Sequence, residues 1–221
     1  MKNKCMLVAA LLLLSGTISA KVVLPPMFSD NMVLQQQADA PIWGEAKPMK
    51  TVKVTTSWDG KTYETLSDKE GKWKLSVRTP EAGGPYELTL TDGQKLVLKN
   101  VMIGEVWICS GQSNMELPMS RVKDRFPEDV KDCKNTQIRT FKIRENGVFT
   151  APLTEPESGE WKSAQPETIL EFSATGYYFA KALQELLKVP VGFIDASLGG
   201  SLIESWMSRE MLNGMDEELA L

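Results

Sequence analysis

The chain has 221 residues, of which 42% are hydrophobic, and its 25 Lys and Arg against 29 Asp and Glu give a net charge of −4. The apolar content is sufficient for a folded core and excludes a chain that is disordered throughout. The acidic balance argues against a nucleic-acid partner, because a phosphate-binding surface needs a basic excess. The chain contains no histidine, which is an obstacle to any mechanism that needs a histidine base.

Residues 1–20 have the pattern of a secretory signal peptide. Lys2 and Lys4 precede an apolar run, and the small residues that end at Ala20 fit a cleavage site. The apolar run, residues 6–14, is about nine residues long, whereas roughly twenty are needed to span a bilayer. The pattern therefore favours export to the periplasm or the extracellular space over stable membrane insertion.

Two cysteines, Cys109 and Cys133, lie beyond this segment. They could pair in an oxidising compartment. Cys109 lies in the apolar segment VWIC, where a cysteine often acts as a small hydrophobic residue, so two free thiols are favoured. Neither cysteine has the spacing of a zinc site, and we expect no metal and no cofactor.

Residues 21–100 alternate with the period of β-strands. The runs TVKVTTSW (51–58), KWKLSV (72–77), YELTLT (86–91) and KLVLK (95–99) are separated by Asp-Gly, Glu-Gly and Gly-Gly-Pro turns. Short strands at this spacing indicate a small antiparallel β-sandwich, in which no residue pattern suggests catalysis. Its tryptophans Trp43, Trp58 and Trp73 could contact sugar, but core positions are favoured.

From residue 101 the pattern changes to that of an α/β domain. VMIGEVWIC (101–109), RTFKI (139–143) and VGFIDAS (191–197) are apolar runs typical of buried parallel strands. Between the last two, apolar residues recur at helical spacing from Phe172 to Leu187, with Ser173 placed to cap the helix. The Pro-, Glu- and Ser-rich stretch 145–168 is expected to be a long surface excursion.

Two of these strands end in unusual loops. The first runs into Ser110-Gly111-Gln112-Ser113-Asn114, and the third into Ser197-Leu198-Gly199-Gly200-Ser201. In an open parallel sheet, ligands bind beyond the carboxyl ends of the strands. A serine on one loop and glycine amides on the other would form half of an acyl-transfer site, in which Ser113 attacks and backbone amides hold the oxyanion. Plain turn chemistry and a structural glycine bend are the alternatives.

Four ordered blocks resemble the sialate O-acetylesterase family, a branch of the SGNH-type serine esterases. They are LPPMFSDNMVLQQQADAPIWGEA, ICSGQSNMELP, FSATGYYFAKAL and VPVGFIDASLGGSLIESWM. Leu198 stands where the family pattern has a tryptophan, and Leu202 where it has a proline. The resemblance implies an SGNH-hydrolase-like parallel sheet over residues 101–221, which is incomplete, preceded by the β-sandwich of residues 21–100.

The resemblance assigns roles to seven residues. Ser113 would be the nucleophile, and the amides of Ser113 and of Gly199 or Gly200 would form the oxyanion hole. Gln112 and Asn114 would orient the serine loop or be ordinary loop residues. Trp206 would line a sugar pocket or belong to a core or lid, and Glu204 would bind a sugar hydroxyl or, as we favour, support the glycine loop.

The family's base is a histidine in a late Asp-x-x-His block, which this chain does not contain. We therefore expect the N-terminal portion of a longer esterase, or a truncated one, that acts on O-acetylated sialic acid or a related sugar. Two other hypotheses stay open at this point. One is an esterase of acetylated xylan, and the other is a secreted carbohydrate-binding protein without catalytic activity.

Overall fold

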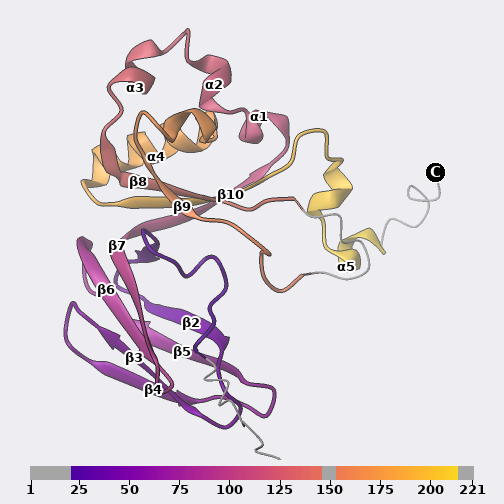
Figure 1. Ribbon diagram of the computed structural model, residues 1–221. Helices are drawn as coiled ribbons and strands as arrows, with labels where there is room; N and C mark the ends of the chain where they lie inside the picture. The colour runs from indigo at the N-terminus through magenta and orange to yellow at the C-terminus, as the bar shows by residue number, and fades with distance from the viewer. Residues whose placement is uncertain (1–20, 146–152, 214–221) are drawn as a thin grey trace, which may run out of the picture.

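The computed structural model describes residues 21–145 and 153–213 (Figure 1). The expected signal peptide, residues 1–20, lies outside the described residues. In chain order the strands are β1 (Val33–Gln35), β2 (Asp39–Glu45), β3 (Thr51–Thr56), β4 (Thr62–Leu66), β5 (Lys72–Arg78), β6 (Gly83–Thr91), β7 (Lys95–Gly111), β8 (Asn135–Lys142), β9 (Trp161–Ala164) and β10 (Val191–Ser197). The helices are α1 (Ser113–Glu116), α2 (Met119–Val122), α3 (Pro127–Lys131), η1 (Ile169–Glu171), α4 (Ala174–Leu187), η2 (Ile203–Trp206) and α5 (Arg209–Leu212).

One mixed sheet extends through both the lower and the upper part of the molecule in Figure 1, in the order β4-β3-β6-β7-β10-β8-β9. Strands β4, β3, β6 and the first half of β7 pair antiparallel, whereas the second half of β7 pairs parallel with β10, and β10 with β8. Strands β2 and β5 form a separate antiparallel pair. The structure thus confirms an α/β arrangement with a parallel sheet that follows antiparallel β-structure.

Two hydrophobic clusters hold these layers together. In the lower part, Ile42 and Val77 from the β2–β5 pair pack with Val52 and Leu88 from the large sheet, and all four are fully buried. Inward-facing residues alternate with outward-facing polar ones along β3, as expected for a strand with one buried face. Trp73 lies in this core, and Trp43 and Trp58 are partly buried against it.

The second cluster lies in the upper part between α4 and the parallel strands. Ser173 caps α4 as predicted, because its hydroxyl accepts a hydrogen bond from the amide of Gly176 at 2.9 Å. Gly176 is also where α4 packs closely against β10, since a Cβ there would lie 2.7 Å from the Phe193 ring. Not all apolar residues of α4 are buried: Phe179 is 40% exposed and Leu186 is 77% exposed.

Strand β7 joins the two parts without interruption. The sequence predicts two strands, 95–99 and 101–109, but the structure has one strand of 17 residues. Asn100 lies between the predicted strands with a left-handed φ of 55°, and pairing continues on both sides of it. The predicted boundary between the two domains falls inside this strand, and the division itself stays a prediction.

The expected surface excursion at 145–168 is only partly an excursion. Residues 146–152 lie outside the described residues, but β9 pairs antiparallel with β8 and closes one edge of the parallel sheet. Trp161 is buried in β9, and its indole Nε1 donates to the Met27 carbonyl at 2.8 Å. The prediction of a loop was wrong here, because the polar composition of the stretch masks the two inward-facing residues, Trp161 and Ala164.

Arg139 links β8 to the lower part. It is only 2% exposed, and its guanidinium donates to the carbonyls of Thr136, Asn31 and Asn100 and to the Asn100 side chain. Burial lowers the pKa of Arg139 to about 10. Because a buried cation is tolerated only when its donors are satisfied, these bonds fix where the two parts of the molecule meet.

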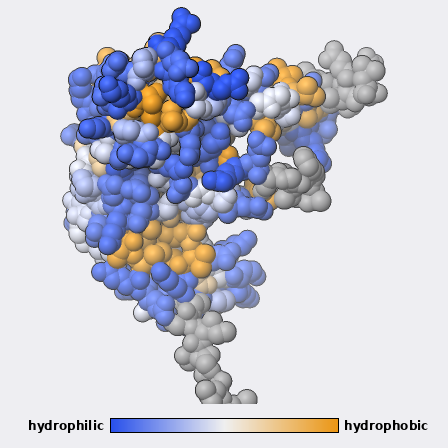
Figure 2. Space-filling view, turned by 45° about the horizontal axis from the view of Figure 1, so that its top comes forward, coloured by the Kyte–Doolittle hydropathy of each residue, from blue (hydrophilic) through white to orange (hydrophobic). Residues whose placement is uncertain are grey.

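No helix among the described residues is long and apolar enough to cross a membrane. Much of the face seen in Figure 2 is polar, and apolar residues gather in a hollow between the upper and lower parts and on the arm that projects to the right. That arm contains η2 and α5, where Leu202 and Ile203 are more than two-thirds exposed.

Candidate active site

The ends of β7 and β10 place the two predicted loops side by side. Ser197, the last residue of β10, pairs with Gly111, the last residue of β7. One residue further on, the amide of Leu198 donates to the Gly111 carbonyl at 2.9 Å. Gly111 has a φ of +142°, which only glycine adopts readily, and the chain turns there into α1. The serine loop and the glycine bend therefore leave the sheet at the same edge.

Ser113 is exposed at the first position of α1. Its Oγ donates to the side-chain Oε1 of Gln112 at 3.1 Å, so Gln112 does contact the hydroxyl that it was predicted to orient. The backbone carbonyl of Gln112 accepts from the amides of Met115 and Glu116, which closes the short helix. The amide of Ser113 itself has no acceptor among the described residues and is available to an approaching ligand.

The glycine bend lies against the serine helix. A Cβ built on Gly199 would lie 3.7 Å from the Cα of Ser113 and 2.4 Å from the Glu116 carboxylate. The amide of Gly199 donates to Glu116 Oε2 at 2.8 Å. The amide of Gly200, which has a φ of +79°, has no acceptor among the described residues. Of the two glycine amides predicted as alternatives for the oxyanion hole, that of Gly199 thus already donates a hydrogen bond and that of Gly200 is free.

The start of α4 holds the serine helix from the other side. The Asn114 carbonyl accepts from the hydroxyl of Thr175 at 2.7 Å, and the hydroxyl of Ser173 donates to the Met115 carbonyl. The amide of Ala174 donates to the Leu117 carbonyl at 2.8 Å. Asn114 is therefore fixed through its backbone, and its side chain makes no hydrogen bond with a described residue.

The two residues predicted further along the chain do not join this arrangement. Trp206 is 42% exposed in η2, and its indole nitrogen donates to the hydroxyl of Ser201 at 2.9 Å. The side chain of Glu204 makes no hydrogen bond or ion pair with any described residue. The glycine loop is supported by Glu116 instead, which sequence reasoning missed although it lies three residues after Ser113, one helical turn away.

A buried polar group lies in β10 beneath the two loops. Asp195 is 1% exposed and accepts a hydrogen bond from the Ser197 hydroxyl, and its Oδ2 lies 3.8 Å from Lys142 Nζ. Burial raises the pKa of the Asp195 carboxyl, and the neighbouring Glu116 charge adds to that rise. The sequence could have indicated this buried group, because Asp195 is the one charged residue in the apolar run VGFIDAS.

Both cysteines predicted to be free are free and buried. Burial raises the pKa of the Cys109 thiol, with a further contribution from the Asp195 charge. The closest partner of Cys133 is the hydroxyl of Tyr177, with 3.8 Å between sulfur and oxygen. Both side chains act as core residues of the upper part, which follows from their place in the second hydrophobic cluster.

Comparisons with known proteins identify the family of the chain. A family model described as carbohydrate esterase, sialic acid-specific acetylesterase matches residues 103–218, more than half of the chain. The chain belongs to this family. The matched residues include the serine helix, the glycine bend and the strands that bring them together.

Relatives in the family extend the likeness to the lower part. The chain is 30% identical over 203 residues to the sialate O-acetylesterase of Mus musculus and 26% identical over 207 residues to that of Homo sapiens. These matches cover 84% and 83% of this chain, but only 37% and 38% of those proteins. A crystal structure of a carbohydrate acetylesterase from Xanthomonas citri matches with a TM-score of 0.82 and 37% identity, over 86% of this chain and 44% of that one.

Proposed function

We propose that Ser113 is the nucleophile of a carbohydrate O-acetylesterase. Its hydroxyl would attack the acetyl carbonyl of a sugar ester, the sugar oxygen would leave with a proton, and water would then release acetate from the acetyl-serine. The observation that carries the proposal is the position of Ser113, exposed at the carboxyl edge of the parallel sheet, where a Cβ built on Gly199 would lie 3.7 Å from the Ser113 Cα. Membership of the esterase family supports it.

The oxyanion hole would use the amides of Ser113 and Gly200. These are the two amides of the serine loop and the glycine bend that have no acceptor among the described residues, while Glu116 holds Gly199. One such donor typically lowers the barrier by about 3 kcal/mol. The role of Glu116 would be to keep the bend at a fixed distance from the nucleophile, so that the free amide points at the developing charge.

These 221 residues contain no histidine that could act as the general base for Ser113. Ser113 Oγ contacts Gln112, a neutral amide that cannot take its proton, and the sequence has no histidine. We propose that the complete enzyme uses a histidine from outside these residues. An exported esterase whose sandwich of residues 21–100 is an accessory domain fits the signal-like N-terminus and the apolar cluster of the lower part.

The test is acetate release from O-acetylated sialic acid. It should be measured on the 221-residue chain, and on the longest in-frame product of its gene, with Ser113→Ala and Ser120→Ala forms of each. Ser120 is an exposed serine in α2 and serves as the matched control. We expect Ser113→Ala to abolish the activity of the active form and Ser120→Ala to leave it unchanged. Equal rates for wild type and Ser113→Ala would remove Ser113 from the mechanism.

A second substrate class is acetylated polysaccharide such as xylan. It is favoured by the match to the Xanthomonas citri structure, which is that of a carbohydrate acetylesterase. Acetate release from acetylated xylan, measured in parallel, separates the two classes. A third outcome is that neither substrate is cleaved but a glycan binds, and that Ser113→Ala does not weaken this binding. That outcome would support the hypothesis of a non-catalytic carbohydrate-binding protein.

A further inference from the structure

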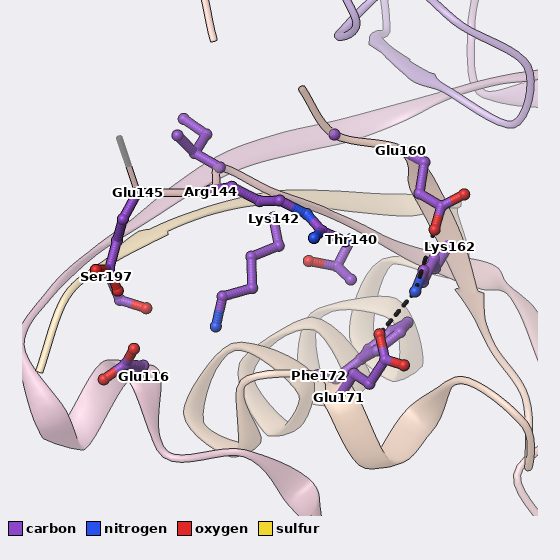
Figure 3. A pocket seen from close by; sticks show the side chains of 12 residues that line it. Glu116, Thr140, Lys142, Arg144, Glu145, Glu160, Lys162, Glu171, Phe172 and Ser197 are labelled. Carbon is purple, nitrogen blue, oxygen red and sulfur yellow. Dashed lines mark hydrogen bonds and ion pairs between the residues drawn. The ribbon is translucent and has the colours of Figure 1, made fainter. Parts of the chain in front are cut away.

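A cavity of about 350 Å³ opens next to the serine helix (Figure 3). It lies between β8, the loop before β9, and residues 171–172, which precede the cap of α4. Glu116 from α1 and Ser197 from the end of β10 form the wall that it shares with the candidate active site. A sugar whose acetyl group reaches Ser113 could therefore place another part of its ring in this cavity, which we call the Lys142 pocket.

The Lys142 pocket contains hydrogen-bond donors that lack acceptors. Figure 3 shows the side chain of Lys142 reaching across the pocket, with its ammonium toward Glu116 and Ser197. The Lys142 side chain is 43% exposed, and its ammonium lies 3.8 Å from Asp195 Oδ2, too far for a hydrogen bond. No described residue accepts a hydrogen bond from it. A cation in a pocket with its N–H groups unused is a ready partner for an anion.

Thr140 provides a second, independent indication on the same face of β8. It precedes Lys142 by two residues, so both side chains leave the strand in the same direction. Thr140 is 6% exposed and lines the pocket, yet its Oγ1 has no hydrogen-bond partner. Buried hydroxyls are nearly always paired, and an orphan that faces a cavity points to a ligand atom that would pair with it.

Lys162, the other lysine of the pocket, has a hydrogen-bonded carboxylate partner, unlike Lys142. Lys162 donates to Glu171 at 2.7 Å and lies 3.2 Å from Glu160, as the dashed lines in Figure 3 indicate. Both carboxylates raise the pKa of Lys162. These three charges are thus committed to one another, which leaves Lys142 and, at the pocket mouth, the exposed Arg144 as cations for a ligand.

Asp195 explains why Lys142 stays in the pocket. Its buried carboxylate holds the ammonium by charge alone, while the hydroxyl of Ser197 satisfies its other oxygen. Charge attraction without a hydrogen bond positions the lysine but leaves all three of its N–H groups free. The carboxylate of Glu116, which accepts from Gly199 through one oxygen, offers the pocket an acceptor for a sugar hydroxyl.

We propose that the Lys142 pocket binds the carboxylate of an acidic sugar through Lys142 Nζ and Thr140 Oγ1. The proposal rests on the proposed function in that the sugar is the one whose acetyl ester Ser113 attacks. It adds the residues that would select a sugar acid over a neutral acetylated sugar. The Thr140 hydroxyl is covered by protein atoms in the structure, so a carboxylate would reach it after a movement of side chains that line the pocket.

The test is a binding measurement that needs no ester cleavage. The 221-residue chain is titrated calorimetrically with N-acetylneuraminic acid and with its neutral methyl ester. We expect the acid to bind about tenfold more tightly, the usual value of one charge-assisted hydrogen bond. Lys142→Met should remove that preference, Lys142→Arg should keep most of it, and Thr140→Val should reduce it severalfold. Lys134→Met, at an exposed lysine outside the pocket, is the matched control and should retain the preference.

Equal affinity for the acid and the ester, no binding of either, or a preference that survives Lys142→Met would overturn the proposal. Should Lys142→Met fail to fold, which circular dichroism would show, the wild-type comparison and Thr140→Val decide the matter. Because the ligands carry no acetyl ester on oxygen, the result is independent of Ser113 chemistry. A chain that prefers the acid but whose complete form releases no acetate would refute the proposed function alone.

Discussion

The Glu116 carboxylate accepts a hydrogen bond from the Gly199 amide at 2.8 Å, and this bond connects the helix that begins with Ser113 to the bend that follows β10. Both partners are partly buried, so the bond is only partly exposed to competition from water. It determines the spacing between the candidate nucleophile and the candidate oxyanion donor. A side chain that is neither the proposed nucleophile nor a proposed oxyanion donor thus controls the geometry on which the proposal depends.

Removal of the Glu116 carboxylate should loosen this connection. We expect Glu116→Ala to lower the free energy of unfolding by about 1–2 kcal/mol, since a charge-assisted hydrogen bond is lost and the Gly199 amide is left without its partner. Glu116→Gln keeps an acceptor oxygen and should lose less than half of that. Urea unfolding of the three forms measures the difference. If Glu116→Ala and Glu116→Gln were equally stable, the bond would have no part in holding the bend.

A methyl group at Gly104 should disrupt the start of the parallel sheet. A Cβ there would lie 2.0 Å from the Pro190 carbonyl oxygen, a backbone atom that cannot move aside cheaply. We expect Gly104→Ala to cost about 3 kcal/mol or more, as is typical of overpacking in a core. Gly60→Ala is the control: it has open space around its Cβ but a φ of +69°, so it should cost about 1 kcal/mol.

The measurement for both glycine variants is thermal or urea unfolding, with the fraction of soluble protein as a second readout. Gly104→Ala matters for the site because Glu105, the next residue, begins the pairing of β7 with β10. A Gly104→Ala protein as stable as Gly60→Ala would show that the Pro190 carbonyl can yield, and that the contact between these strands is looser than the structure shows.

The ion pair between Lys181 and Asp129 should make stability depend on pH. The hydrogen bond from Lys181 lowers the pKa of the Asp129 carboxyl, and Tyr178 adds a second bond. A carboxyl with a lowered pKa stabilises the fold above its ordinary pKa of 3.8 and loses that contribution as pH falls through the lower, folded value. Because both side chains are about a quarter to a third exposed, the pair is worth only about 0.5 kcal/mol.

We therefore expect Lys181→Met to be slightly less stable than wild type at pH 7, with the difference vanishing below the folded pKa of Asp129. Lys188→Met, at the exposed end of α4, is the control and should show no such trend. Urea unfolding at several pH values from 2 to 7 provides the comparison. A difference that stays constant down to the lowest pH would assign the effect of Lys181 to packing rather than charge.

The strands, the capped helix and the loop pair at the sheet edge were predictable because each has a local signal. Alternation at residues 51–58, the apolar run 191–197 and the serine before α4 each specify structure from neighbouring residues alone. The continuous β7 was not predictable, because Asn100 in a left-handed conformation looks like a break in any local pattern. Strand β9 was missed for a similar reason, since a four-residue strand carries little periodicity.

At the site, the sequence predicted which loops meet but not what holds them. Ser113 and the glycines were identified from residue type and order, and the Gln112 contact followed from adjacency. The hydrogen bond from Gly199 to Glu116 and the charge attraction between Lys142 and Asp195 join residues that are far apart in the chain, and only the tertiary structure brings them together. The ion pair between Lys181 of α4 and Asp129 of α3 likewise joins residues that are far apart in the chain.

Strand β7 also limits how this architecture can be rearranged. Its first residues belong to the antiparallel sheet, and its last residue, Gly111, delivers the chain to Ser113. Domains joined by a flexible linker can be exchanged or deleted without changing the structure of their neighbours. Here an insertion or deletion within residues 95–111 would shift the register of the edge that leads to Ser113, so the lower part and the serine loop depend on the same strand.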